Sequence, residues 1–201
     1  MTTANRSLDR LSWFRWVTAG EFVGFAVPAV VGAVSASPAL LVLAGVVEGA
    51  VLGWAQARVL TRVLPGLPGL QWVATTAAAA GFAWTVAMTA TANGERLATW
   101  PAVALLPVAT VLGMAVLLSI GTAQWLVLRY HVANAHRWIW ATGVAWGVAL
   151  LVFLGVTTPL WQPGQGLALR VLIGVLGGLL MAATMAAITG AVLVRLVEER
   201  R

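Results

Sequence analysis

The chain has 201 residues, of which 61% are hydrophobic and only 9% are charged, a composition far outside the range of soluble domains. It contains no cysteine, which excludes disulfides and thiolate metal sites or nucleophiles, and all twelve of its basic residues are arginine. The net charge of +6 does not indicate nucleic-acid binding, because the arginines lie at the ends of apolar runs instead of along one face. The composition therefore predicts an integral membrane protein.

The chain opens with a polar segment, residues 1–15, which we expect to be cytoplasmic, with a short interfacial helix over Ser7 to Phe14. The first apolar run, residues 16–34, is long enough to cross a hydrocarbon core of about 30 Å at a rise of about 1.5 Å per residue. A basic start before an apolar run also resembles a signal peptide, but this run is long and contains Glu21. We therefore predict that it is the first span.

Five more apolar runs follow, separated by polar or proline- and glycine-rich links, over residues 39–60, 70–92, 102–130, 138–160 and 167–197. Residues 198–201 form a short tail. If the N-terminus is cytoplasmic, all arginines except Arg96 and Arg170 lie on the cytoplasmic side. These patterns predict an all-α polytopic protein of the bacterial plasma (inner) membrane, with one domain of six spans and both termini in the cytoplasm.

The ends of the even-numbered spans repeat one pattern. The sequence GWAQARVL at residues 53–60 returns as GTAQWLVL at residues 121–128, which aligns Gln56 with Gln124, and a fainter copy puts Gly190 at the same position. Tryptophan opens the helices that follow the first two copies, at Trp72 and Trp138, and Trp16 opens the first span similarly. We therefore predict a helical hairpin of about sixty-six residues used three times, with pseudo-threefold symmetry along the membrane normal.

These helix ends also carry a resemblance. The motifs GxxQxxVL and GxxQWxVLR, each followed by a helix that opens on tryptophan, resemble those of a loosely defined set of uncharacterised multi-spanning bacterial membrane proteins. The resemblance covers most of the chain from about residue 45. It implies a helical membrane protein and no particular activity.

Small residues recur at every fourth position in three of the runs, which allows close approach of helix backbones. They are Gly45, Gly49 and Gly53 in the second run, Ala115, Ser119 and Ala123 in the fourth, and Gly174, Gly178, Ala182, Ala186 and Gly190 in the sixth. One interpretation is packing of the even-numbered spans around the bundle axis. The other is an interface with a second copy or with a partner membrane protein.

The residue with the best claim to a function is Glu48, near the middle of the second run. An ionised acid at that depth costs roughly 2.5 to 3.5 kcal/mol, so we expect a proton carrier or a hydrogen-bond donor. Gln56 lies two turns further on the same helix face and would extend a polar site. Glu21 and Gln124 are weaker candidates, because Arg15 can neutralise Glu21 and a glutamine within lipid commonly bonds another helix. Glu48 could likewise serve only a structural hydrogen bond.

Templates for catalysis are missing from the sequence. There is no GxSxG, no HExxH, no aspartate within a span and no glycine-rich phosphate loop. His131 and His136 have no acidic or sulfur ligand beside them. We therefore predict no enzyme, no metal and no cofactor.

Two classes of function remain. The first is a small transporter, channel or solute-binding protein with its polar site around Glu48. The second is a structural or accessory membrane subunit, which would bind lipid, pigment or a partner membrane protein through its small-residue faces. In either case we expect contact with membrane lipid and none with nucleic acid. A water-accessible cavity that reaches Glu48 would favour the first class, and a bundle packed solid around it the second.

Overall fold

The computed structural model describes residues 9–199, which form seven helices and no strand. Six helices are long: α1 (Arg10–Val34), α2 (Pro38–Val63), α3 (Gly69–Ala92), α5 (Ala102–Leu128), α6 (Arg137–Leu160) and α7 (Leu167–Glu198). Each of the six is long and apolar enough to cross a membrane. The six predicted runs are therefore confirmed as helices. The sequence did not predict the short helix α4 (Gly94–Ala98) in the link between α3 and α5.

The first helix begins earlier than the hydropathy predicts. Asp9 caps α1, because its side chain accepts a hydrogen bond from the backbone N–H of Leu11 at 3.0 Å. Of the predicted interfacial helix, Ser7 and Leu8 lie outside the described residues. From Arg10 onward the helix runs without a break into the predicted span, and Trp13 in its first turn is fully buried in the core of the bundle.

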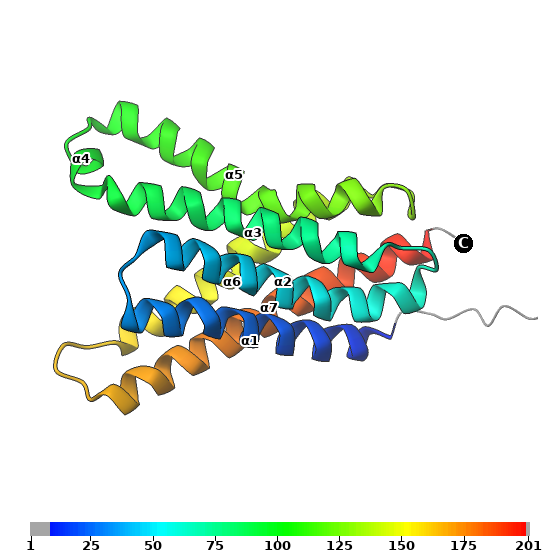
Figure 1. The fold of residues 1–201 in the computed structure, drawn as a ribbon, viewed down its shortest axis with the longest axis horizontal. Coiled ribbons are helices and arrows are strands. Elements are labelled where there is room, and N and C mark those ends of the chain that lie inside the picture. Colours follow the sequence, from blue (N-terminus) through cyan, green and yellow to red (C-terminus); the bar gives the residue numbers. More distant parts are fainter. Residues whose placement is uncertain (1–8, 200–201) are drawn as a thin grey trace, which may run out of the picture.

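The six long helices form a closed ring. Each packs against two neighbours, in the order α1, α2, α3, α5, α6, α7 and back to α1. In Figure 1 the chain is seen from the side, with both ends of the described chain at the same end of the bundle. We call this the arginine-rich end, because Arg10, Arg62, Arg129, Arg137 and Arg195 lie at the helix ends there. The opposite end, which carries α4 and the links α1–α2 and α6–α7, is called the open end.

The glycine stripe of α2 faces α3, its next neighbour in the ring. A Cβ atom on Gly49 would lie 2.5 Å from the Cβ of Ala80, and one on Gly53 would lie 3.0 Å from the Cβ of Thr76. Only glycine permits this approach. The expectation that the stripe joins the even-numbered spans to one another is wrong for α2, because its partner is an odd-numbered span.

The other stripes differ in what they face. Gly178 faces Phe25 of α1, and Gly190 lies against Trp13, where an added Cβ would be 2.7 Å from the indole Cδ1. Gly174 is only partly buried, and its nearest neighbour is Trp161. The short stripe of α5, residues Ala115, Ser119 and Ala123, lines a groove between α3 and α5 on the outside of the ring.

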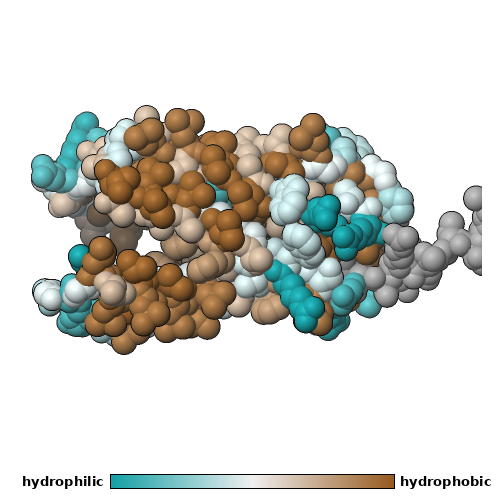
Figure 2. All heavy atoms as spheres, turned by 60° about the horizontal axis from the view of Figure 1, so that its bottom comes forward, coloured by the Kyte–Doolittle hydropathy of each residue, from teal (hydrophilic) through white to brown (hydrophobic). Residues whose placement is uncertain are grey.

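The ring is tightly packed at the arginine-rich end and loose at the open end. Trp13, Trp72 and Trp138 are fully buried near the arginine-rich end. By contrast, residues 102–114 of α5 are exposed except for the partly buried Leu105. Figure 2 shows apolar side chains over most of the open half, with a hollow between two apolar lobes. The helices therefore surround a space that only one half of the bundle fills.

Candidate functional site

A layer of buried polar contacts crosses the ring in its arginine-rich half. The indole Nε1 of Trp72 donates to Oε1 of Gln56 at 3.0 Å, and Nε1 of Trp138 donates to Oε1 of Gln124 at 2.8 Å. A third contact of the same kind joins Trp13 to the hydroxyl of Thr189 at 3.2 Å. Each contact links a tryptophan to the preceding helix of the ring: Trp72 joins α3 to α2, Trp138 joins α6 to α5, and Trp13 joins α1 to α7.

Gln124 ties this layer together. Its Nε2 donates both to Oε1 of Gln56 at 2.7 Å and to Oγ1 of Thr76 at 2.9 Å. The indole of Trp138 packs edge-on to Trp13 and at a tilt to Trp72, with ring centroids 6.1 and 6.3 Å apart. Because these groups are buried and are joined by hydrogen bonds or by ring contacts, the layer closes the ring at this level.

A cavity of about 230 Å³ lies inside the ring on the open side of this layer. All six long helices contribute to its wall, and the side chains are almost entirely apolar. Leu52 and Ile120 line it, and each lies one helical turn before Gln56 or Gln124 of the polar layer. The polar layer is therefore the floor of the cavity.

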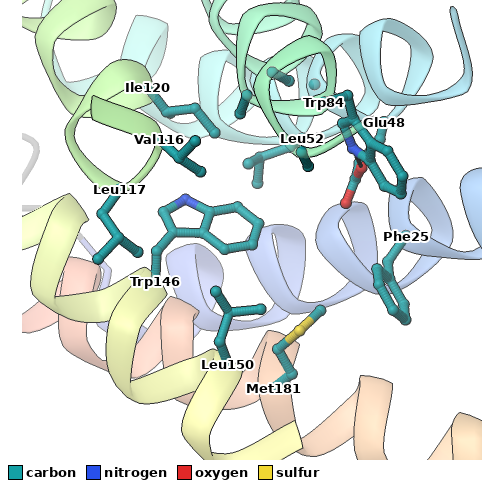
Figure 3. Close-up of a pocket in the computed structure, with 14 residues that line it drawn as sticks. Phe25, Glu48, Leu52, Trp84, Val116, Leu117, Ile120, Trp146, Leu150 and Met181 are labelled. Atoms are coloured by element: carbon teal, nitrogen blue, oxygen red, sulfur yellow. Dashed lines mark hydrogen bonds between the residues drawn. The ribbon is translucent and has the colours of Figure 1, made fainter. Parts of the chain in front are cut away.

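Glu48 is the only ionisable side chain among the residues that line this cavity. It is 6% exposed, and Figure 3 shows its carboxylate directed into the space beside the indole of Trp84. The Nε1 of Trp84 donates to Oε2 of Glu48 at 2.7 Å, and Glu48 makes no other side-chain hydrogen bond within residues 9–199. One carboxylate oxygen is thus held by the indole of Trp84, and the other has no hydrogen-bond partner within residues 9–199.

The position of Trp84 depends on Gly45. A Cβ atom at Gly45 would lie 1.9 Å from Cδ1 of Trp84, so the indole lies directly on the glycine backbone. The small-residue stripe of α2 thereby serves two purposes. It brings α3 close, and it makes room for the tryptophan that holds Glu48.

Glu21 is a second buried acid next to Glu48. It is fully buried on α1, and neither of its carboxylate oxygens has a hydrogen-bond partner among the described residues. Gly24, one turn further along α1, lies directly on the backbone of Glu48, and the two carboxyl groups are close enough to interact electrostatically. Arg15 does not neutralise Glu21 through an ion pair, because the one ion pair of the described chain joins Arg137 to Glu199.

The structure therefore divides the four predicted polar residues into two pairs. Glu48 lines the cavity and Glu21 lies buried behind it, whereas Gln56 and Gln124 bond each other in the floor. Five threonine hydroxyls of α3 donate to carbonyls of their own helix; they are Thr75, Thr76, Thr85, Thr89 and Thr91.

Two tryptophans of the site escaped the sequence analysis. Trp84 and Trp146 both line the cavity, and the buried Nε1 of Trp146 has no hydrogen-bond partner among the described residues. A signal was present, because both lie in the middle of a span, whereas anchoring tryptophans gather at the membrane interfaces.

No protein-family model, no curated protein and no solved structure matches this chain. Its function must therefore be inferred from the site itself.

Proposed function

We propose that this protein is a non-enzymatic membrane transporter, channel or solute-binding protein whose site is the cavity at Glu48. The observation that carries the proposal is the cavity itself, because it lies inside the helix ring and places one acid against an otherwise apolar wall. Ionisable groups at the middle of a span commonly mark a solute or ion pathway. A purely structural subunit would instead be expected to pack solid around Glu48.

The membrane placement belongs to the same proposal. The six apolar helices would cross the bacterial inner membrane with both termini in the cytoplasm, since the arginines gather at one end of the bundle. The closed floor would then face the cytoplasm and the cavity would open outward. Membrane lipid would cover the apolar exterior, and the groove between α3 and α5 is available to a second copy or a partner membrane protein.

We further propose that the ring consists of three helical-hairpin repeats with pseudo-threefold symmetry along the membrane normal. The three tryptophan contacts of the polar layer support this arrangement, because each joins equivalent spans. They also refine the alignment, since Trp13 replaces Trp16 and Thr189 replaces Gly190 as the equivalent residues. Glu48 lies two helical turns before Gln56. The residues two turns before Gln124 and Thr189 are the apolar Val116 and Met181. The acid therefore makes a single asymmetric site in a repeated frame.

Access of solvent to the cavity tests the proposed function. The chain has no cysteine, so one introduced thiol is unique. Ala83→Cys places that thiol in the cavity wall, and Ala145→Cys places it at a fully buried position as a matched control. In lipid nanodiscs a water-soluble thiol reagent should modify Ala83→Cys rapidly and Ala145→Cys hardly at all. Equal resistance of the two variants would mean a sealed bundle and would favour the structural or accessory role.

A further inference from the structure

The charges around the cavity are of one sign. Glu48 borders the space and Glu21 lies buried behind it, and no arginine pairs with either acid within residues 9–199. A bound cation would compensate the charge of an ionised Glu48, whereas an anion would meet two acids and no positively charged group. The electrostatics of the cavity therefore favour a cation or a strong hydrogen-bond donor.

The remaining wall is suited to an organic cation and not to a metal ion. Metal cations such as Ca²⁺ and Mg²⁺ require about six or more oxygen ligands, and the cavity wall offers a single carboxylate. It offers aromatic rings instead: Figure 3 shows Phe25 and Trp84 next to Glu48, and the indole of Trp146 lies across the space. The faces of such rings attract ammonium groups, above all where water is excluded.

The size of the cavity sets the size of the ligand. A dry apolar cavity of about 150 Å³ holds one benzene ring. The 230 Å³ found here accommodates one such ring together with a short ammonium-bearing arm. The free oxygen of Glu48 can receive the charged group, while the carboxylate stays fixed by the 2.7 Å hydrogen bond from Trp84.

We propose that the ligand of this cavity is a small organic monocation, an amine or quaternary ammonium compound with an apolar or aromatic body. The ammonium group would lie against Glu48 and the aromatic rings, and the apolar body would contact the leucine, valine and methionine side chains of the wall. This inference rests on the proposed function and specifies its substrate class.

Direct binding of a model cation tests the inference. Radiolabelled benzyltrimethylammonium is equilibrated with the full chain in lipid nanodiscs, and phenylethylammonium, phenylacetate and benzyl alcohol are used as competitors of similar size. We expect saturable binding at one site per chain, displaced by phenylethylammonium but not by the anionic or the uncharged compound. The comparison of ligand charges uses the unaltered protein, so it does not depend on the folding of a variant.

Glu48→Gln should weaken this binding by about tenfold or more, whereas Glu95→Gln, at an exposed acid on α4, should leave it unchanged. Equal competition by benzyl alcohol or phenylacetate would overturn the inference, and so would unchanged binding in Glu48→Gln. If Ala83→Cys reacts with solvent but no saturable cation binding occurs, the substrate class is wrong and the proposed function stands. An unreactive Ala83→Cys would instead refute the proposed function and with it this inference.

Discussion

Replacing Gly45 by alanine tests the link between helix packing and the acid site. The new methyl carbon would lie 1.9 Å from Cδ1 of Trp84, whereas carbon atoms in contact are separated by about 3.5 Å or more. The indole must therefore move by about 1.6 Å or more, or α3 must shift away from α2. Either movement displaces Nε1 of Trp84 relative to Glu48, which it now contacts at 2.7 Å, and weakens or breaks that hydrogen bond.

Two contributions set the size of the effect. Losing a hydrogen bond to a carboxyl group costs about 1.5–3 kcal/mol, and forcing an extra methyl group into a packed contact typically costs about 1–3 kcal/mol. Alanine gains up to about 1 kcal/mol over glycine in helix propensity, which partly offsets these losses. We expect the free energy of unfolding to fall by about 2–4 kcal/mol.

Gly113→Ala is the matched control. The repeat aligns Gly113 with Gly45, but nothing lies within 4 Å of a Cβ atom added there. Unfolding of both variants is measured by denaturant titration in mixed detergent micelles, and benzyltrimethylammonium binding is measured in nanodiscs. Gly45→Ala should lose stability and bind the cation more weakly, while Gly113→Ala should do neither. Equal behaviour of the two variants would refute the claim that Gly45 positions Trp84.

Three further changes address other parts of the ring. Glu48→Gln should keep the fold, since an amide oxygen still accepts from Trp84. It should abolish any proton-coupled uptake of benzyltrimethylammonium into proteoliposomes, because an amide does not titrate; unchanged uptake would make Glu48 structural. Gly49→Leu should prevent α2 from packing on α3 and abolish the folded peak in size-exclusion chromatography, unlike Gly147→Leu, which meets no neighbour; a well-folded Gly49→Leu would contradict the packing. Gln124→Leu leaves the indole N–H of Trp138 unpaired and should lower the free energy of unfolding by about 2 kcal/mol or more; an unchanged denaturation midpoint would show that the layer is not stabilising.

The sequence was sufficient to predict the six long helices because their signal is local. A run of apolar residues bounded by proline, glycine and arginine predicts a helix long enough to cross a membrane, whatever lies beside it. The place of Glu48 near the middle of a long helix could be predicted for the same reason, since it follows from counting residues along the run. Its hydrogen bond from Trp84 could not, because that contact depends on how α2 and α3 are rotated against each other.

The facing of the helices was beyond the sequence because the spans are apolar on every side. Trp13 and Trp16 illustrate the difficulty, since both lie in the first turns of one helix. Trp13 is fully buried in the polar layer, whereas Trp16 lies at the periphery, edge-on to Trp54 and under the guanidinium of Arg58. Hydropathy does not distinguish the two, so both could be read as interface anchors.

The same limit explains why one predicted polar site became two. Glu48 and Gln56 do lie on one side of α2, as their spacing requires. Leu52 is buried between them and lines the cavity, so the acid faces open space and the amide faces the floor. A helix net shows which residues share a side, but only the neighbouring helices decide where a cavity ends.

The closed ring also bears on how the chain is connected. The first and last helices, α1 and α7, are neighbours, and Trp13 bonds Thr189 where they meet. The beginning of α1 and the end of α7 lie at the same end of the bundle as the links α2–α3 and α5–α6 (Figure 1). A linker could therefore join α7 to α1 while the chain is opened in either of those links, and every helix would keep both neighbours. The order of the hairpins along the polypeptide is thus separable from their order in space. With the chain opened in either link, Glu48 of α2 would still face the same cavity.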